Sequence, residues 1–351
     1  MKKNISGIQQ VGIGVSNAKE AWKWYRKAFG MDINVFEDTA VARLMKHYTN
    51  NKECERYAAL AMNMEGGGGF EIWQHTGFES QAPKFDVQLG DTGIFIVKMK
   101  CRDVEKAYQW HTEMGCQLLS KVEKDPSGTA HYYLKDPYNN IFEVVHCNYV
   151  YKKQKSATGG VAGVVIGVSN MDKALEVYAG ILEYSVVAYD QSDVFADLAG
   201  MPGGNQKLRR VLLKHEARSG AFSKLFGPTQ IELVQCLTRD PKYIFEDRIW
   251  GELGYIHLCF DVNGMDLLKK EASNLGYEFT ADSANSFDMG VAAGHFAYIS
   301  DPDNTPIEFV ETHKLPLIEK LGWYMNLKDR NPKKPLPNWM VNTIRWGRVK
   351  E

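Results

Sequence analysis

The chain repeats itself, and this repeat constrains the fold more than any other feature of the sequence. Residues 11–25 read VGIGVSNAKEAWKWY and residues 164–178 read VVIGVSNMDKALEVY, so Ile-Gly-Val-Ser-Asn and the later Ala and Tyr recur at an offset of 153 positions. In both copies an apolar strand ends at a Ser-Asn pair that favours a helix N-cap, and an amphipathic helical pattern follows. Because self-similarity fixes architecture, the sequence predicts a duplication.

Each half contains a second, weaker echo. Residues 94–118 and 255–279 again read as strand, turn, helix, Gly and new strand. Both halves end in matching Asp-Pro-x-Asn turns, which begin at Asp136 and Asp301 and are each followed by a Glu on the next strand. The sequence therefore predicts four modules, each with one strand, one helix and about three more strands, at residues 5–73, 90–148, 158–236 and 251–311.

The expected domains follow from the two halves. Residues 1–150 and 158–313 are predicted to form one domain each, and the modular pattern stops after His313. The remaining residues, 314–351, are expected to form a helical extension with a first helix around 315–327 and a second short helical stretch. Its four large aromatic residues predict that the extension docks on the body of the protein; they are Trp323, Tyr324, Trp339 and Trp346.

Composition excludes several classes of partner. With 42 basic and 43 acidic residues the net charge is −1, so the basic excess typical of nucleic-acid binding is missing. No apolar run of membrane-spanning length and no signal-peptide pattern occurs, and the six cysteines form no CxxC pair. We expect a cytoplasmic protein with reduced cysteines and with neither nucleic acid nor a membrane as partner.

One histidine stands out within an apolar strand. His257 is the single imidazole in GYIHLCFDV, residues 254–262, and a lone buried histidine is more often a hydrogen-bonded core residue than a ligand. The last strand of every module, however, also carries a carboxylate in apolar surroundings, where an isolated charge would be costly. These carboxylates are Glu71, Glu143, Glu232 and Glu308. Their recurrence favours His257 as a ligand.

This layout resembles the vicinal oxygen chelate superfamily over about residues 5–311; the superfamily includes glyoxalase I, bleomycin-resistance proteins and extradiol dioxygenases. The resemblance implies an α+β fold in which four βαβββ modules form two cupped mixed-sheet domains, here with a C-terminal helical extension. It also implies a divalent metal ion inside a cup, held from the first and last strands of the modules. The first-strand positions in this sequence are Gln10, Ile96, Gly163 and His257, and the last-strand positions are the four glutamates.

Two pairings of modules are possible. If neighbours pair, Glu232 joins His257 and Glu308, and Gly163 supplies no ligand. If the outer modules pair, as in a fused domain-swapped dimer, one cavity collects Gln10, Glu71, His257 and Glu308, the ligand set of the glyoxalase I enzymes that this chain resembles. The outer pairing is favoured because it leaves one complete and one degenerate site, and Glu232 is the alternative ligand.

The resemblance implies a metal-dependent enzyme with one divalent ion, which Zn, Ni, Co, Mn or Fe would satisfy. The expected reaction is proton transfer next to a carbonyl group of a small oxygenated substrate, as in a glyoxalase-like isomerase, epimerase or lyase. Glu308 and Glu71 are the expected catalytic bases. The expected partner is a small-molecule substrate, and the expected oligomeric state is a monomer or a homodimer.

Two alternatives stay open at this point. A non-heme iron dioxygenase of the extradiol or hydroxyphenylpyruvate type needs two His and one carboxylate, but Gly163 stands where the first His belongs and only His215 offers a substitute. A metal-free protein that sequesters a ligand is the second alternative. Arg209, Arg210 and His215 are candidate substrate-binding residues, the two arginines because a guanidinium binds anionic groups.

Overall fold

The computed structural model describes residues 3–284, 287–288, 293–318, 323–328 and 330–349, and it confirms an α+β fold of four βαβββ modules. The first module consists of β1 (Asn4–Gly14), α1 (Ala18–Phe29), β2 (Ile33–Val41), the 3-10 turn η1 (Arg43–Tyr48), β3 (Glu55–Met62) and β4 (Gly69–His75). The second consists of β5 (Gly93–Cys101), α2 (Val104–Glu113), β6 (Gln117–Leu118), β7 (Glu123–Lys124), β8 (Ala130–Lys135) and β9 (Ile141–His146).

The second half repeats this order. Its first module consists of β10 (Val161–Gly167), α3 (Met171–Leu175), the π-helical turn η2 (Glu176–Ile181), β11 (Val186–Asp193), η3 (Ala196–Leu198), β12 (Leu208–Lys214), α4 (Ser223–Phe226) and β13 (Gln230–Cys236). The last module consists of β14 (Gly254–Asn263), α5 (Met265–Asn274), β15 (Ala281–Asp282), β16 (Phe287–Asp288), β17 (Ala293–Ser300) and β18 (Pro306–Ile318).

The repeated Ser-Asn pair works as a helix start, as predicted. The Asn17 side chain accepts a hydrogen bond from the Glu20 backbone N–H at 3.2 Å, and Asn170 does the same for Lys173 at 3.1 Å. The longest of the described helices, α1, has 12 residues and ends at Gly30 in the left-handed conformation (φ 62°). Within the described part of the chain, no helix is long and apolar enough to cross a membrane.

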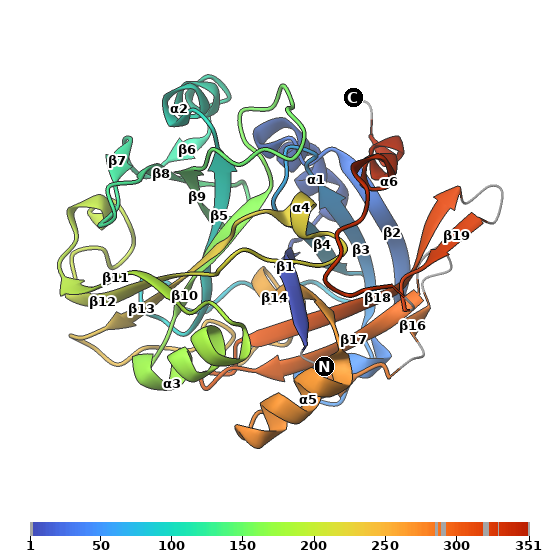
Figure 1. Ribbon diagram of the computed structural model, residues 1–351. Coiled ribbons are helices and arrows are strands. Elements are labelled where there is room, and N and C mark those ends of the chain that lie inside the picture. The colour runs from blue at the N-terminus through green and yellow to red at the C-terminus, as the bar shows by residue number, and fades with distance from the viewer. Residues whose placement is uncertain (1–2, 285–286, 289–292, 319–322, 329, 350–351) are drawn as a thin grey trace.

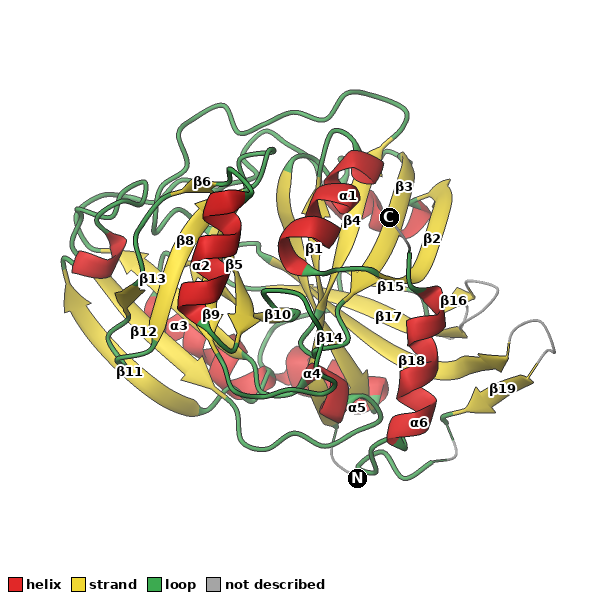
Figure 2. Cartoon of the chain, turned by 90° about the horizontal axis from the view of Figure 1, so that it is seen from above, coloured by secondary structure: helices red, strands yellow, loops and turns green. Residues whose placement is uncertain are grey.

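The sheets join the outer modules and the inner modules, which confirms the outer pairing and shows that the neighbour pairing is wrong. One sheet runs β15-β17-β18-β14-β1-β4-β3-β2, and the other runs β11-β12-β13-β10-β5-β9-β8-β6. In Figures 1 and 2 the strands form two groups, and strands β1–β4, blue in Figure 1, lie with β14, β17 and β18, which are orange and red there. The expected domains 1–150 and 158–313 therefore each contribute strands to both sheets, because β1 pairs with β14 and β5 pairs with β10.

Neighbouring modules nevertheless contact each other through the Asp-Pro turns. The Tyr25 hydroxyl of α1 donates to the Asp136 carboxylate at 2.7 Å, and the Tyr178 hydroxyl donates to Asp301 at 2.9 Å. Each Asp also accepts backbone N–H groups of its own turn, such as Asn140 N–H on Asp136 at 2.8 Å. The repeat thus preserves a buried Tyr–Asp hydrogen bond that joins the helix of one module to the turn of the next.

The C-terminal extension differs from the prediction in its first part. Strand β18 continues to Ile318 and pairs with β19 (Trp323–Asn326), so the helix expected around 315–327 is wrong for the described residues, and 319–322 lie outside them. Continued pairing on the sheet overrides the local helical pattern. The second helical stretch is confirmed as α6 (Asn338–Val341) and η5 (Asn342–Gly347).

The extension docks on the body through aliphatic residues. Leu327, Leu336 and Val341 are buried in a cluster with Met62 and Phe226. Trp339 and Trp346, by contrast, are 65% and 66% exposed, and the side chains of Trp323 and Tyr324 lie outside the described part. Docking is therefore present, but neither Trp339 nor Trp346 carries it.

Candidate metal centre

Four side chains from four adjacent strands of the outer sheet converge at its centre. Strand β14 positions His257, β1 positions Gln10, β4 positions Glu71 and β18 positions Glu308. The register explains the convergence, because Gly12 of β1 pairs with His257 on one side and with Glu71 on the other. A Cβ atom at Gly12 would lie 2.5 Å from His257 Cε1, so only glycine lets the imidazole lie against β1.

The polar atoms of these side chains lie close together and are buried. His257 Nε2 is 3.2 Å from one carboxylate oxygen of Glu71 and 3.2 Å from one of Glu308. The Gln10 side-chain amide lies 3.4 Å from the same Glu308 oxygen. One ligand atom each from Glu71, His257 and Glu308 lie within 4.8 Å of one another. This spacing suits three ligands that share one ion.

The hydrogen bonding of the cluster is incomplete. His257 Nε2 and Gln10 Oε1 are both buried and have no hydrogen-bond partner within the described part of the chain. Buried polar atoms in folded proteins are nearly always satisfied, and an orphaned atom calls for a specific explanation. The Gln10 amide donates to Glu308, and His257 Nε2 lies at ion-pair distance from both carboxylates, yet two of the converging polar atoms keep no hydrogen-bond partner, which fits residues that hold a cation.

The electrostatics of the cluster also favour a cation. Burial and the neighbouring Glu71 carboxylate raise the pKa of Glu308 to about 7, although His257 opposes this shift. Burial lowers the pKa of His257, but the Glu308 and Glu71 carboxylates outweigh it and raise that pKa above its ordinary value. Two carboxylates and one imidazole in apolar surroundings are poorly compensated by themselves.

Two aromatic residues hold the imidazole in place. The Trp250 ring lies parallel to His257, with centroids 5.9 Å apart and an interplanar angle of 13°. The Tyr298 ring meets the imidazole edge-on, and its hydroxyl lies 3.5 Å from His257 Nδ1. A hydrogen bond to the second ring nitrogen fixes the orientation of a ligand histidine. Sequence reasoning missed Trp250, Tyr298 and Gly12. A sequence signal existed for Tyr298, which pairs with Glu308 on the neighbouring strand, because Tyr133 pairs with Glu143 in the same way in the other half of the repeat.

The cluster borders a cavity of about 380 Å³. Gln10, Glu71 and Glu308 face this cavity, whereas His257 lies behind them and is fully buried. The volume falls within the range of about 300–1,000 Å³ that is typical of small-molecule sites. The site therefore has room for a ligand beside the carboxylates.

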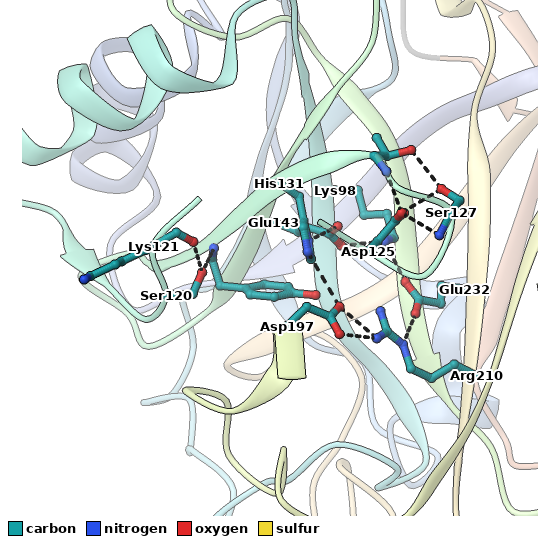
Figure 3. A network of polar contacts seen from close by, with 12 residues as sticks. Lys98, Ser120, Lys121, Asp125, Ser127, His131, Glu143, Asp197, Arg210 and Glu232 are labelled. Carbon is teal, nitrogen blue, oxygen red and sulfur yellow. Dashed lines mark hydrogen bonds and ion pairs between the residues drawn. The ribbon is translucent and has the colours of Figure 1, made fainter. Parts of the chain in front are cut away.

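The inner sheet contains the equivalent centre, and there a lysine lies between the glutamates (Figure 3). Lys98 Nζ is 2.5 Å from Glu143 and 2.7 Å from Glu232, and all three side chains are buried. Lys98 occupies the repeat position of Cys259, since it pairs with Glu143 as Cys259 pairs with Glu308. The sequence did carry a signal for this ion pair: Lys98 lies within an apolar strand of the same module whose last strand carries Glu143.

Further charged residues complete the inner network. Arg210 donates to Glu232 at 2.6 Å and to Asp197 at 2.8 and 2.9 Å, and His131 contacts Glu143 at 2.8 Å (Figure 3). Burial raises the pKa of Glu232, but Arg210 and Lys98 outweigh it and hold that pKa well below its ordinary value. The inner centre is thus neutralised by the protein's own cations.

The remaining predicted site residues lie away from the outer cavity. Glu232, the alternative ligand, and Arg210 belong to the inner network. Arg209 forms a surface ion pair with Asp190 at 2.8 Å, and His215 contacts Thr229 at 3.1 Å. The three residues predicted to bind substrate, Arg209, Arg210 and His215, therefore do not line the outer cavity.

The comparisons with known proteins agree with this fold. Residues 7–144 match the family model of the Glyoxalase/Bleomycin resistance protein/Dioxygenase superfamily. A point mutant of glyoxalase I from Zea mays is similar to 88% of this chain and 94% of its own, with 13% identity and a TM-score of 0.56. A putative dioxygenase from Bacillus subtilis is similar over 100% of this chain and 98% of its own, with 13% identity and a TM-score of 0.57.

Residues 7–144 therefore match the glyoxalase/bleomycin resistance protein/dioxygenase superfamily, as the resemblance predicted for this part of the chain, and the two solved structures share the fold of most or all of the chain. At 13% identity the two solved structures establish a shared fold and nothing about the reaction. No protein of curated function matches the sequence significantly.

Proposed function

We propose that this protein is a metal-dependent enzyme that moves a proton next to a carbonyl group of a small oxygenated substrate, in the manner of an isomerase, epimerase or lyase. The observation that carries this proposal is the convergence of Gln10, Glu71, His257 and Glu308, two of them with orphaned polar atoms, beside a cavity. The proposed ligands of a divalent ion are His257, Glu308, Glu71 and Gln10. Bound there, the ion would supply Lewis-acid stabilisation of the negative charge that develops on substrate oxygen.

The glutamates are the proposed proton carriers. Glu71 and Glu308 line the cavity, and their carboxylates flank the space in which a substrate carbon would lie. Efficient acid–base catalysis needs a pKa near the working pH. The apolar surroundings that raise the pKa of Glu308 to about 7 act in that direction. The proposed role of His257, which does not face the cavity, is to hold the ion and not to transfer the proton.

The dioxygenase alternative has weaker support in the donor set. That class uses two histidines and one carboxylate, and this cluster offers one histidine, two carboxylates and an amide. His215, the substitute considered from the sequence, directly follows β12 of the inner sheet and contacts Thr229. The donor set therefore favours proton transfer over oxygen activation.

Metal content is the first test. The purified chain should contain about one equivalent of a divalent ion by elemental analysis, and His257→Ala should lose it while the fold is retained. His215→Ala is the matched control, because it removes a histidine from the other sheet. Full metal occupancy in His257→Ala would refute this site. A protein without metal, whose stability is unchanged by chelators, would leave only the ligand-sequestering alternative.

Isotope exchange tests the reaction class. In deuterated water the enzyme should place solvent deuterium on the carbon beside the carbonyl of accepted 2-oxoaldehyde adducts or 2-oxo acids. Glu308→Gln should suppress exchange by about 10²–10⁴-fold, the usual contribution of a general acid–base residue. Oxygen consumption without exchange would instead establish the dioxygenase.

A further inference from the structure

The cavity beside the candidate metal centre is lined mostly by apolar side chains, and this lining indicates which class of substrate it can bind. We propose that it binds a molecule with vicinal oxygens at one end and an extended, uncharged apolar group at the other, and that the C-terminal extension supplies part of the wall for that group. The assignment of the oxygenated end rests on the proposed function. The apolar end rests on the cavity walls alone.

Apolar side chains from segments far apart in the sequence form the cavity walls. Strands β2 and β3 contribute residues such as Val35 and Leu60, and α4 with its preceding residue contributes Phe222, Leu225 and Phe226. Helix α4 comes from the third module, so the inner half of the chain closes a cavity of the outer sheet. A ligand that fills this space exchanges water for hydrocarbon contacts along most of its length.

The charged residues of the wall are already paired. The cations among the described residues that line the cavity are Arg43 and Arg56. Arg56 lies 3.0 Å from the Asp38 carboxylate and stacks over the Trp73 ring at 5.2 Å, and Arg43 lies 3.8 Å from Glu53. Arg56 is held by both of its contacts, whereas the Arg43 pair is exposed and weak. Among the described residues, the walls therefore offer an anionic group no buried cation without a partner, and an uncharged tail satisfies them.

The C-terminal extension reaches this cavity through Ile344 of η5. Its backbone is fixed to the body at both ends, because the Leu336 N–H donates to Ala221 O at 2.9 Å and the Val349 N–H donates to Asp32 O at 2.9 Å. Between these bonds, η5 packs on β2 and Val341 is buried. Figure 1 shows α6 beside β2. The extension thus acts as a fixed wall that limits the length or width of the apolar group.

A series of straight-chain hydroxamates, from acetohydroxamate to dodecanohydroxamate, tests the proposal on the full chain loaded with metal. Each hydroxamate carries two vicinal oxygens, and only the alkyl chain varies. Calorimetric affinity should rise about fourfold for each added methylene until the chain fills the cavity. Matching chains that end in a carboxylate should bind more weakly than their uncharged counterparts. Equal affinity across the series, or preference for the carboxylate, would overturn the proposal.

Variants of Ile344 locate the wall. Ile344→Trp should weaken binding of the longest chains by at least tenfold while short chains bind as before, and Ile344→Ala should admit longer chains than the parent. Trp339→Ala, on the same extension but 65% exposed and away from the cavity, should leave the series unchanged. An Ile344→Ala series identical to the parent series would show that the extension does not limit the ligand.

Chelated protein separates this inference from the proposed function. If chain length still governs affinity in protein stripped of metal, and metal adds nothing, the apolar site stands and the metal centre fails. If metal strengthens binding of every hydroxamate equally and chain length has no effect, the metal centre stands and the apolar site fails.

Discussion

The outer and inner centres occupy the same place in the repeat, yet their buried carboxylates are compensated differently. Glu308 and Glu143 are equivalent residues on the last strands of their modules. On the parallel first strand of the same module, Glu308 pairs with Cys259 and Glu143 pairs with Lys98. Burial raises the pKa of Glu308 to about 7. Burial also raises the pKa of Glu143, but Lys98 and His131 outweigh it and hold that pKa below its ordinary value.

The first strands differ in the same sense. Gly12 leaves room for the His257 imidazole, whereas the equivalent residue of the inner centre is Val165, which pairs with Ile96. Two carboxylates at the centre of a cup need a cation, and the inner centre carries its own in Lys98 and Arg210. The outer centre has a histidine, an amide and an adjoining cavity instead. The two centres therefore differ in whether a cationic side chain of the protein lies between the glutamates.

The largest effect is expected for Lys98→Met, which removes the ammonium but keeps most of the side-chain volume. Glu143 and Glu232 then remain buried with one cation fewer, and breaking such a pair costs about 3–5 kcal/mol of unfolding free energy. Urea denaturation at neutral pH measures this loss. Cys259→Ala, at the equivalent outer position, is the control and should cost about 1 kcal/mol. A similar cost for both variants would remove the distinction between the centres.

The pH dependence of stability in metal-free protein should separate the two carboxylates. The pKa of Glu308 is about 7 in the folded chain and ordinarily 4.5, so the folded chain binds this proton more tightly than the unfolded chain does. The resulting contribution to the free energy of unfolding is complete below about pH 4.5 and is lost as the pH rises through 7. The loss amounts to about 3 kcal/mol. Urea titrations of chelated protein at several pH values measure it.

The control for this titration is a pair of variants. Glu308→Gln should flatten the decline between pH 5 and 8, whereas Glu143→Gln should not, because the pKa of Glu143 is shifted in the opposite direction. The comparison with the parent protein is needed because burial also raises the pKa of Asp261 to about 7. An unchanged slope in Glu308→Gln would contradict the assignment.

The Tyr–Asp contacts are a place where the two halves are expected to behave alike. Tyr25→Phe and Tyr178→Phe each remove a hydroxyl that donates to a buried carboxylate, of Asp136 and Asp301 respectively. Each change should lower the free energy of unfolding by about 1–3 kcal/mol. Thermal or urea unfolding measures both, and a large cost in one half with none in the other would show that the duplication does not conserve this contact.

The smallest effect is expected for Tyr298→Phe, which removes the hydroxyl near His257 Nδ1 and keeps the ring. Metal affinity should fall by about tenfold, the lower end of the usual range for partners of ligand histidines, because the contact is long. Competition with a metal indicator measures this change. Tyr133→Phe, the equivalent change in the inner centre, should leave metal affinity as it was, and an equal loss in both variants would argue against a positioning role for Tyr298.

Much of the fold could be predicted from the sequence because its signals are local. The Ser-Asn helix starts, the Asp-Pro turns and the apolar strands each depend on neighbouring residues, and their repetition marked all four modules. The same register singled out His257 and the four glutamates. The failure around 315–327 has the opposite cause, since β18 extends by pairing with β19, a contact that no local pattern reports.

The candidate site divides in the same way. The sequence by itself determined which residues are candidate ligands, because the repeat and the resemblance that it carries assign one first-strand and one last-strand position to each module. Only the tertiary structure decided that Glu71 and not Glu232 lies beside His257, since both pairings satisfy the same local rules and the choice is made where the first strands β1 and β14 pair across 250 residues of sequence. The cavity, the stacked Trp250 and the wall from Ile344 also arise from contacts between distant segments, and a strand pattern carries no information about such contacts.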